Sequence, residues 1–351
     1  MPHLRWPTLV SGLAALALLA TAGNGAAAEP HHPRGHDGRA ELPTYLARDA
    51  QGVVTSPQAS GSFQGADGLL YEYAPMVVGG WDGQVFYGPD FDTACADGAR
   101  FKQGLRRLAK LAKLIESTGR RVVLTVAPNK TSIYDDQIDW VGLPHGACTR
   151  LGLERQDDLL DDYGNRNYLP LRRALSKDPR ETYWKTDTHW TSVGSSIFAE
   201  RLAARLDKKL AGRQRYALTQ AEFQGDLFSL LGIPQPETAQ AVVPTNNVSV
   251  RIGPPDPNVE LQQTWTSSPR KKTLRGKTVL IGDSYSFVGL STLRPLFHKG
   301  HFVWITQENL DYIAQSLVAS DTVVIEVVQR FVSSSLLGTK AFRAQVRRTL
   351  R

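Results

Sequence analysis

Four short apolar segments, each next to a segment of helical period, are the feature that most constrains the fold of this chain. The segments are RVVLTV at residues 121–126, KTVLI at 277–281, FVWI at 302–305 and TVVIEVV at 322–328. Runs that lack polar alternation predict strands buried on both faces, as in parallel sheets. Apolar residues recur at helical spacing over residues 101–115 and over one long stretch, 193–210. Helices that alternate with buried strands predict an α/β fold, a three-layer α/β/α sandwich with a mostly parallel sheet.

The overall charge narrows the class of partner. The chain has 351 residues, a formal net charge of +7 and hydrophobic and charged fractions of 41% and 21%, which are ordinary for a globular protein. Its basic residues are scattered and are not interleaved with aromatic residues, so we expect no nucleic-acid partner. A basic surface suits an anionic partner, such as an acidic polysaccharide or an anionic membrane face.

The N-terminus has the parts of a secretory signal peptide at residues 1–28. Arg5 precedes an apolar run, and small residues suited to a signal peptidase follow up to Ala28. The run is short for a transmembrane helix. We therefore predict a secreted or extracytoplasmic protein, in the periplasm or at the cell surface, with an uncleaved membrane anchor as the alternative. Residues 29–60 predict a flexible leader, whose histidines lack the neighbours of a metal site, and residues 61–351 a catalytic domain.

Two further features concern the organisation of that domain. Cys95 and Cys148 are the only cysteines, and an even number in an exported protein predicts a disulfide. Neither cysteine lies in a nucleophile motif, which disfavours a catalytic thiol. Residues 212–275 are rich in proline and predict an irregular insertion or a small antiparallel subregion.

A candidate nucleophile follows the apolar segment at residues 277–281, where the chain reads GDS before a helix-like stretch. Ligands of open α/β sheets bind beyond the carboxyl ends of the strands, and free N–H groups at a helix N-terminus stabilise an oxyanion. Gly282 allows close backbone approach, Asp283 caps the helix or braces the loop, and Ser284 is the candidate nucleophile. The tripeptide alone is more typical of a plain turn with a capping serine, so this assignment needs a separate base.

The segment TDTHW at residues 186–190 offers that base. A serine hydroxyl needs an imidazole that accepts its proton, and the imidazole needs a carboxylate that fixes its tautomer. Side chains two residues apart in an extended segment point the same way. We therefore expect Asp187 to reach Nδ1 of His189 and to leave Nε2 for Ser284. The alternative is a buried polar pair among aromatic residues, and a helical turn at 187–189 would separate the two side chains.

Four motif blocks resemble the SGNH (GDSL-type) hydrolases, in the permuted order of the AlgX/AlgJ-like alginate O-acetyltransferase group. The Asp/His block of most SGNH hydrolases follows the GDS block, whereas here DTHW lies about a hundred residues before GDSYS. The four blocks are GGWDGQVFYG, VVLTVAPNKTSIY, TDTHWTSVGS and VIEVVQR. The resemblance covers residues 65–335 approximately and implies an SGNH or flavodoxin-like fold.

The same resemblance implies an exported serine-dependent O-acetyltransferase that acts on hydroxyls of an extracellular or cell-surface polysaccharide, as in exopolysaccharide biosynthesis. Ser284 would form an acetyl-serine intermediate, His189 would be the general base and Asp187 would orient it. Lys130 and Arg330 would lie at the active site, with a plain salt bridge as the alternative for Arg330. The implied partners are a polysaccharide acceptor and a membrane-bound O-acyltransferase that donates the acetyl group; no cofactor or metal is implied.

Other substrate contacts are expected from residue type. Asn129 is a candidate oxyanion donor. The flat rings of Trp81, Trp184, Trp190 and Tyr285 are suited to stacking on sugars, although core packing explains them equally well. Two alternative functions use the same residues. One is a carbohydrate esterase or deacetylase with water as acceptor, and the other is a non-catalytic glycan-binding protein of the same fold.

Overall fold

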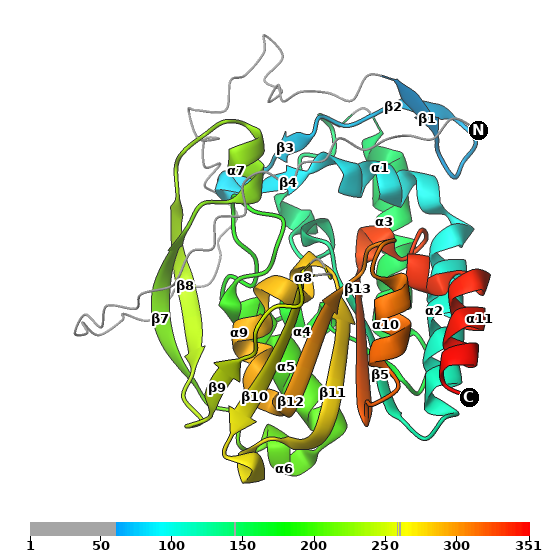
Figure 1. Ribbon diagram of the computed structural model, residues 1–351. Coiled ribbons are helices and arrows are strands. Elements are labelled where there is room, and N and C mark those ends of the chain that lie inside the picture. The colour runs from blue at the N-terminus through cyan, green and yellow to red at the C-terminus, as the bar shows by residue number, and fades with distance from the viewer. Residues whose placement is uncertain (1–60, 144, 258, 260) are drawn as a thin grey trace. The chain divides into compact units, whose positions relative to one another are not determined.

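A seven-stranded sheet forms the centre of the chain (Figure 1). The computed structural model describes residues 61–351 except 144, 258 and 260, so the predicted signal peptide and leader lie outside the described residues. The strand order is β6-β5-β13-β11-β12-β10-β9. The strands of this sheet are β5 (Arg121–Ala127), β6 (Tyr168–Leu169), β9 (Ser249–Ile252), β10 (Gln262–Ser268), β11 (Leu274–Gly282), β12 (Phe297–Trp304) and β13 (Thr322–Val328).

The sheet is mostly parallel, as predicted. The pairings of β6 with β5, β5 with β13, β13 with β11 and β11 with β12 are parallel, whereas β10 and β9 are added antiparallel at one edge. The four apolar segments of the sequence are the central strands β5, β11, β12 and β13. Their carboxyl ends lie at one edge of the sheet, because parallel neighbours end together.

Helices cover both faces of the sheet, which confirms the three-layer sandwich. Successive side chains of a strand point to opposite faces, so Val122 and Leu124 of β5 pack with α2, α10 and α11, while Val123 and Ala127 pack with α5 and α9. The helices are α1 (Gly88–Asp97), α2 (Ala99–Glu116), α3 (Gly146–Asp162), α4 (Arg172–Ser176), α5 (Ser192–Leu206), α6 (Lys208–Ala211), α7 (Asp226–Leu230), α8 (Ser284–Val288), α9 (Leu290–Leu293), α10 (Leu310–Ser316) and α11 (Lys340–Thr349). In this described part of the chain, no helix has both the length and the apolar character needed to cross a bilayer.

The predicted single helix over residues 193–210 is wrong in one respect. It is divided into α5 and α6 at Asp207, whose side chain accepts hydrogen bonds from the backbone N–H groups of Lys209 and Leu210. An aspartate that caps a helix N-terminus in this way stabilises a new start rather than a continuation.

Residues 212–275 are not irregular. They form a hairpin of β7 (Tyr216–Phe223) and β8 (Glu237–Pro244), paired along their whole lengths, with α7 between the two strands. They also supply β9 and β10, the antiparallel edge of the central sheet. The antiparallel alternative therefore describes this region. Two other short hairpins lie nearer the N-terminus, β1 (Ser62–Gln64) with β2 (Leu70–Glu72) and β3 (Val77–Gly79) with β4 (Val85–Tyr87).

The predicted disulfide is present and joins Cys95 of α1 to Cys148 of α3. The two cysteines are separated by 53 positions. We expect the double variant Cys95→Ser, Cys148→Ser to lose about 4 kcal/mol in free energy of unfolding, because the unfolded chain regains the entropy that the closed loop denies it. Urea denaturation of both proteins at one pH measures the difference. A loss below about 1 kcal/mol would contradict the expected contribution of loop closure.

Candidate active site

Two of the motif blocks and the GDS turn meet at the carboxyl edge of the sheet. Asn129 follows β5, Asp283 follows β11 and Gln329 follows β13. Hydrogen bonds join the three loops: the backbone N–H of Asn129 donates to Oε1 of Gln329 at 2.9 Å, and the N–H of Val328 donates to Oδ2 of Asp283 at 2.7 Å. This is the edge where open α/β sheets bind their ligands.

Ser284 is the first residue of α8, directly after the strand β11, and is half-buried. Asp283 performs both roles considered for it, since Oδ1 accepts the N–H of Tyr285 at 3.0 Å and caps the helix, while Oδ2 braces the end of β13. Position 282 leaves no room for a side chain. A Cβ atom there would lie 2.4 Å from Oγ of Ser286, so no larger residue fits without a shift of the turn.

Glu326 of β13 supports the turn from below and was not singled out as a site residue by the sequence. It is fully buried, and its Oε2 accepts hydrogen bonds from the N–H of Asp283 at 3.3 Å and from the N–H and Oγ of Ser286 at 3.2 and 2.7 Å. Burial, followed by the nearby charge of Asp283, raises the pKa of Glu326 well above its usual value. Glu326 therefore fixes the turn around Ser284 through three hydrogen bonds to one of its oxygens.

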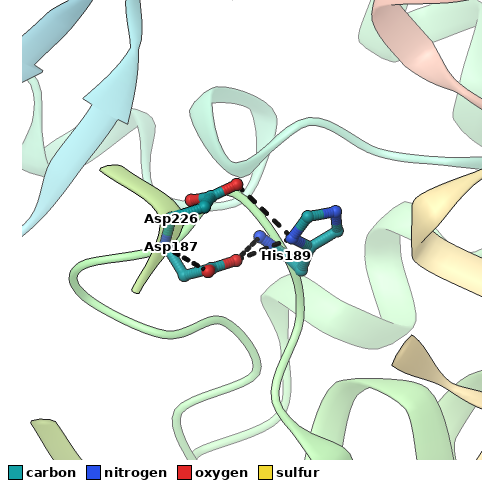
Figure 2. Close-up of side chains that lie close together, drawn as sticks. All are labelled: Asp187, His189 and Asp226. Carbon is teal, nitrogen blue, oxygen red and sulfur yellow. Dashed lines mark hydrogen bonds and ion pairs between the residues drawn. The ribbon is translucent and has the colours of Figure 1, made fainter. Parts of the chain in front are cut away.

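Asp187 and His189 are brought together as predicted, but by a different backbone. Residues 187–189 form a bend instead of an extended segment. Oδ1 of Asp187 accepts both the backbone N–H of His189 and its Nδ1–H, each at 2.7 Å (Figure 2). An aspartate that bonds the backbone two residues on stabilises such a turn. The ring is thus fixed with its proton on Nδ1.

The second ring nitrogen of His189 points away from the carboxylates (Figure 2). This Nε2 is buried and has no hydrogen-bond partner within the described residues. The ring lies against Tyr285, with centroids 4.9 Å apart, and so contacts the residue that follows Ser284. Imidazole Nε2 is the atom that accepts a proton from a serine in a catalytic triad, and here it is left without a partner beside the start of α8.

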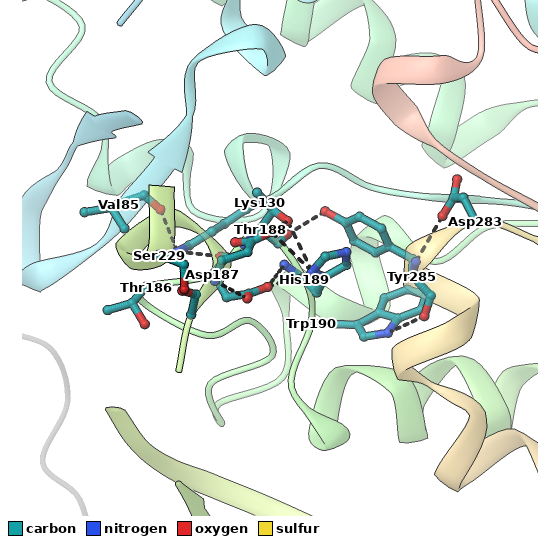
Figure 3. Close-up of polar contacts among 12 residues, drawn as sticks. Val85, Lys130, Thr186, Asp187, Thr188, His189, Trp190, Ser229, Asp283 and Tyr285 are labelled. Atoms are coloured by element: carbon teal, nitrogen blue, oxygen red, sulfur yellow. Dashed lines mark hydrogen bonds and ion pairs between the residues drawn. The ribbon is translucent and has the colours of Figure 1, made fainter. Parts of the chain in front are cut away.

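Tyr285 and Trp190 connect the loop of residues 185–190, the histidine loop, with the turn of residues 282–286, the serine turn (Figure 3). The hydroxyl of Tyr285 donates to the carbonyl of Thr188 at 2.6 Å, and Nε1 of Trp190 donates to the carbonyl of Tyr285 at 3.0 Å. Both rings are buried in the core, so the expectation that they stack on a sugar is wrong. Trp184 is also buried, stacked on Phe223, whereas Trp81 keeps 38% of its surface exposed.

The charges of the pair stabilise each other. Burial lowers the pKa of His189, but the charge and hydrogen bond of Asp187, with the further charge of Asp226, outweigh burial and raise this pKa above its ordinary value. Burial opposes ionisation of Asp187, but the charge of His189 and the N–H groups around the carboxylate lower its pKa. Asp187 is therefore an anion and a suitable partner for the imidazolium that forms when His189 takes a proton.

Asp226, the first residue of α7, is a member of the site that the sequence did not indicate. Its Oδ2 lies 3.6 Å from Nδ1 of His189 (Figure 2). Gly225 lets α7 approach, because a Cβ atom there would lie 2.0 Å from the carbonyl oxygen of Thr186. No pattern in residues 212–275 distinguishes this aspartate, since its role depends on a contact between segments almost forty residues apart.

A metal centre is one alternative for these three side chains, because one donor atom of each of Asp187, His189 and Asp226 lies within 4.8 Å of the others. The donor atoms that lie closest together already take part in hydrogen bonds. Nδ1 of His189 donates to Asp187, and both oxygens of Asp226 accept from Thr188. The arrangement is that of a hydrogen-bonded aspartate–histidine pair with a second carboxylate nearby.

Lys130 lies under the histidine loop and not at an open surface (Figure 3). Its Nζ donates to the carbonyls of Val85 at 2.8 Å, Lys185 at 2.6 Å and Asp187 at 3.3 Å. Burial lowers the pKa of Lys130 to about 7, against the opposing charges of Glu237 and Asp187. Because the amine serves three backbone carbonyls, Lys130 supports the Asp187 loop, in place of the substrate contact expected from the motif.

We expect Lys130→Met to lower the free energy of unfolding by about 3 kcal/mol or more, because three buried carbonyls would lose their donor. Chemical denaturation measures the loss. Lys185→Met is a matched control on the same loop, since the Lys185 side chain is 39% exposed and forms an ion pair with exposed Glu181, and it should cost less than about 1 kcal/mol. Equal losses in the two variants would contradict the role of Lys130.

Arg330 and Asn129 lie together beside Tyr285. NH1 of Arg330 pairs with buried Asp90 at 3.2 Å, and its guanidinium carbon lies 5.4 Å from the centroid of the Tyr285 ring. Oδ1 of Asn129 accepts from the backbone N–H of Arg330 at 3.3 Å. The salt bridge considered for Arg330 is thus present, within the site itself.

Comparisons with known proteins agree with this geometry. A family model described as "SGNH hydrolase-like domain, acetyltransferase AlgX" matches residues 77–292. A probable alginate O-acetylase AlgJ of Pseudomonas syringae pv. tomato is 27% identical over 179 residues, 46% of this chain and 43% of that protein. Its counterpart from Pseudomonas putida is 25% identical over 181 residues, 46% and 44% of the two chains. The chain thus spans less than half the length of these curated relatives.

The fold is also similar to that of a solved structure. Bacillus cereus PatB1, solved with a sulfonyl adduct, matches 74% of this chain and 98% of its own at a TM-score of 0.53 and 10% identity. At that identity the likeness bears on the fold alone. Since the family model matches more than half of the sequence and includes both the Asp/His bend and the serine turn, the chain belongs to the family of SGNH hydrolase-like domains described for the acetyltransferase AlgX.

Proposed function

We propose that this protein is a serine-dependent O-acetyltransferase that acetylates hydroxyl groups of a polysaccharide, with Ser284, His189 and Asp187 as the catalytic residues. One observation carries the proposal: Asp187 holds Nδ1 of His189 at 2.7 Å, while Nε2 is buried with no partner in the described part of the chain, and the ring contacts the residue after Ser284. A pair prepared to accept a proton next to a serine at a strand-to-helix turn fits acyl transfer.

The reaction has two halves. In the first, Nε2 of His189 takes the proton of Ser284 while Oγ attacks the acetyl carbonyl carbon; the proton then passes to the leaving group as its bond to carbon breaks. In the second, Nε2 takes the proton of a sugar hydroxyl, whose oxygen attacks the acetyl-serine. The ester bond to Ser284 breaks, and Oγ regains the proton from His189.

The oxyanion formed in each half needs donors that are free. The N–H groups of Tyr285 and Ser286 already donate to Asp283 and Glu326, so of the first three described N–H groups of α8 that of Ser284 is left for the oxyanion. The side-chain amide of Asn129 is the second candidate. Its Oδ1 faces Arg330, and its Nδ2 has no hydrogen-bond partner among the residues that the structure describes, which supports the role expected from residue type.

The acceptor and donor follow from the relatives and the sequence. The curated relatives are named probable alginate O-acetylases, and the net charge of +7 suits an acidic polysaccharide. A signal peptide at residues 1–28, as predicted from the sequence, would direct the protein to the periplasm or the cell surface. If the segment is not cleaved, it would anchor the protein in the membrane. A membrane-bound O-acyltransferase would then supply the acetyl group.

Incubation of the purified protein with an activated acetyl ester, with and without oligosaccharide acceptors, tests the function. We expect acetylated oligosaccharides, detected by mass spectrometry, and slower release of free acetate when the acceptor is present. Release of acetate without acetylated acceptor would instead identify a carbohydrate esterase with the same triad. Glycan binding with neither product would identify a non-catalytic protein of this fold.

A further inference from the structure

We propose that Asp226 is a positioning residue of the site, which holds the Asp187–His189 bend in place and adds a second negative charge on the Nδ1 side of the imidazole. The effect on rate rests on the proposed function. The effect on the imidazole does not, because it can be observed directly on His189.

Asp226 contacts each residue of the bend. Its backbone N–H donates to Oδ2 of Asp187 at 2.7 Å. Its Oδ1 accepts the N–H of Thr188 at 2.8 Å, and its Oδ2 accepts the Thr188 hydroxyl at 2.6 Å. Oδ2 also lies 3.6 Å from Nδ1 of His189. The carboxylate is therefore fixed in direction at both oxygens, and Asp187 is held at both of its own.

The two carboxylates differ in exposure and in distance from the imidazole, so we assign them different roles. The side chain of Asp187 is 2% exposed and binds Nδ1 directly, whereas that of Asp226 is 40% exposed and lies one step further from the ring. Asp187 therefore fixes the tautomer. Asp226 adds a second negative charge on the same side of the imidazole, which favours the protonated ring.

The groups that face this pair give the direction of the pH dependence. The charges of Asp187 and Asp226 raise the pKa of His189, and the charge of Arg330 lowers it. The pKa of Asp226 is raised by the charge of Asp187 and lowered by that of His189. The charge of Asp226 in turn raises the pKa values of Lys130 and Tyr87. Although 40% of its side chain is exposed, desolvation of the inward-facing part, followed by the charge of Asp187, raises the pKa of Asp226 to about 6. The second charge is accordingly present above about pH 6 and lost below it.

Asp226→Asn removes the charge and keeps the shape. Without that charge the imidazolium is less stabilised, so the pKa of His189 should fall. Since the base acts when deprotonated, the rise of kcat/KM with pH should move to lower pH. On the plateau, kcat should fall about tenfold to a hundredfold, because Thr188 uses both oxygens of Asp226 and an amide offers only one acceptor oxygen to orient the bend. Asp226→Glu retains the charge and should restore much of the His189 pKa.

Glu237→Gln is a control with closely similar loop-holding contacts. Glu237 accepts the N–H groups of Lys185 and Thr186 and the Thr186 hydroxyl, just upstream of the bend, but it is not among the charges with the largest effects on the pKa of His189. A general loosening of the loop would affect both variants alike. A charge effect on the imidazole would appear in the Asp226 variant alone.

Titration of the imidazole by NMR in the full chain, with the His189 signal assigned by its absence in His189→Gln, decides the matter. The expected result is a lower His189 pKa in Asp226→Asn, little change in Glu237→Gln and recovery in Asp226→Glu. An unchanged His189 pKa in Asp226→Asn, or an equal shift in Glu237→Gln, would overturn the proposal. If Asp226→Asn does not fold, Asp226→Ser, which keeps an acceptor for Thr188, is titrated in its place. Full activity of Ser284→Ala would refute the proposed serine mechanism, but it would not change the conclusion drawn from the His189 titration.

Discussion

Ser284→Ala is expected to abolish both acetyl transfer and acetate release, with a loss of at least about 10⁴ in kcat. The side chain supplies the only atom that the proposed acetyl-enzyme can form on. Ser284 begins α8, and its neighbours on both sides are fixed, Asp283 by Val328 and Tyr285 by Thr188. Removal of one hydroxyl therefore should leave the turn intact, and the loss should come from chemistry and not from unfolding.

Ser286→Ala is the matched control for the nucleophile. Ser286 is in the same turn, two residues on, but its hydroxyl donates to Oε2 of Glu326 at 2.7 Å and faces the interior. We expect this variant to lose stability, by about 1 kcal/mol for a buried hydrogen bond, while it still forms the acetyl-enzyme. Steady-state rates with an activated acetyl ester compare the variants. Wild-type turnover by Ser284→Ala would refute the assignment of the nucleophile.

Asp187→Asn is expected to have the second largest effect, a loss of about 10³ to 10⁴ in kcat, by analogy with triads whose aspartate is replaced by its amide. Both oxygens of Asp187 accept hydrogen bonds, Oδ1 from His189 and Oδ2 from the N–H of Asp226. An amide has only one acceptor oxygen, so its NH₂ group would face a donor on one side. The imidazole would lose both its preferred tautomer and its counter-charge.

The pH dependence of Asp187→Asn separates these effects. Asp187 raises the pKa of His189 in the wild type, so this pKa should fall in the variant and the remaining activity should reach its plateau at lower pH. Far-ultraviolet circular dichroism checks that the variant is folded. Activity within about tenfold of the wild type, with an unchanged profile, would show that His189 does not depend on Asp187.

The fold was largely predictable because its signals are local. Each central strand is a short apolar run, and such a run fits only a strand covered on both faces. The turn at Gly282–Ser284 and the disulfide were equally accessible, since a strand followed at once by a helix, or a single pair of cysteines, leaves few alternatives. The split of α5 from α6 at Asp207, the order within residues 212–275 and the bend at residues 187–189 differed from expectation.

The candidate site was predictable only in part, because its remaining members depend on contacts across the fold. Asp226 reaches His189 from a hairpin that has no catalytic motif, and Glu326 reaches the serine turn from the neighbouring strand. Residue type was also misleading for Tyr285 and Trp190, whose polar atoms bond to backbone carbonyls inside the core. Lys130 followed the motif in position, but its amine is directed into the protein.

Peptide mapping by mass spectrometry after brief exposure to an activated acetyl ester tests the central proposal most directly. We predict one acetyl group on the peptide that contains Ser284 in the wild type, its loss when an oligosaccharide acceptor is added with acetyl appearing on the acceptor, and its absence in Ser284→Ala. An unmodified Ser284 during active turnover, or an acetyl group on Ser284 that no acceptor removes, would contradict acetyl transfer through this serine.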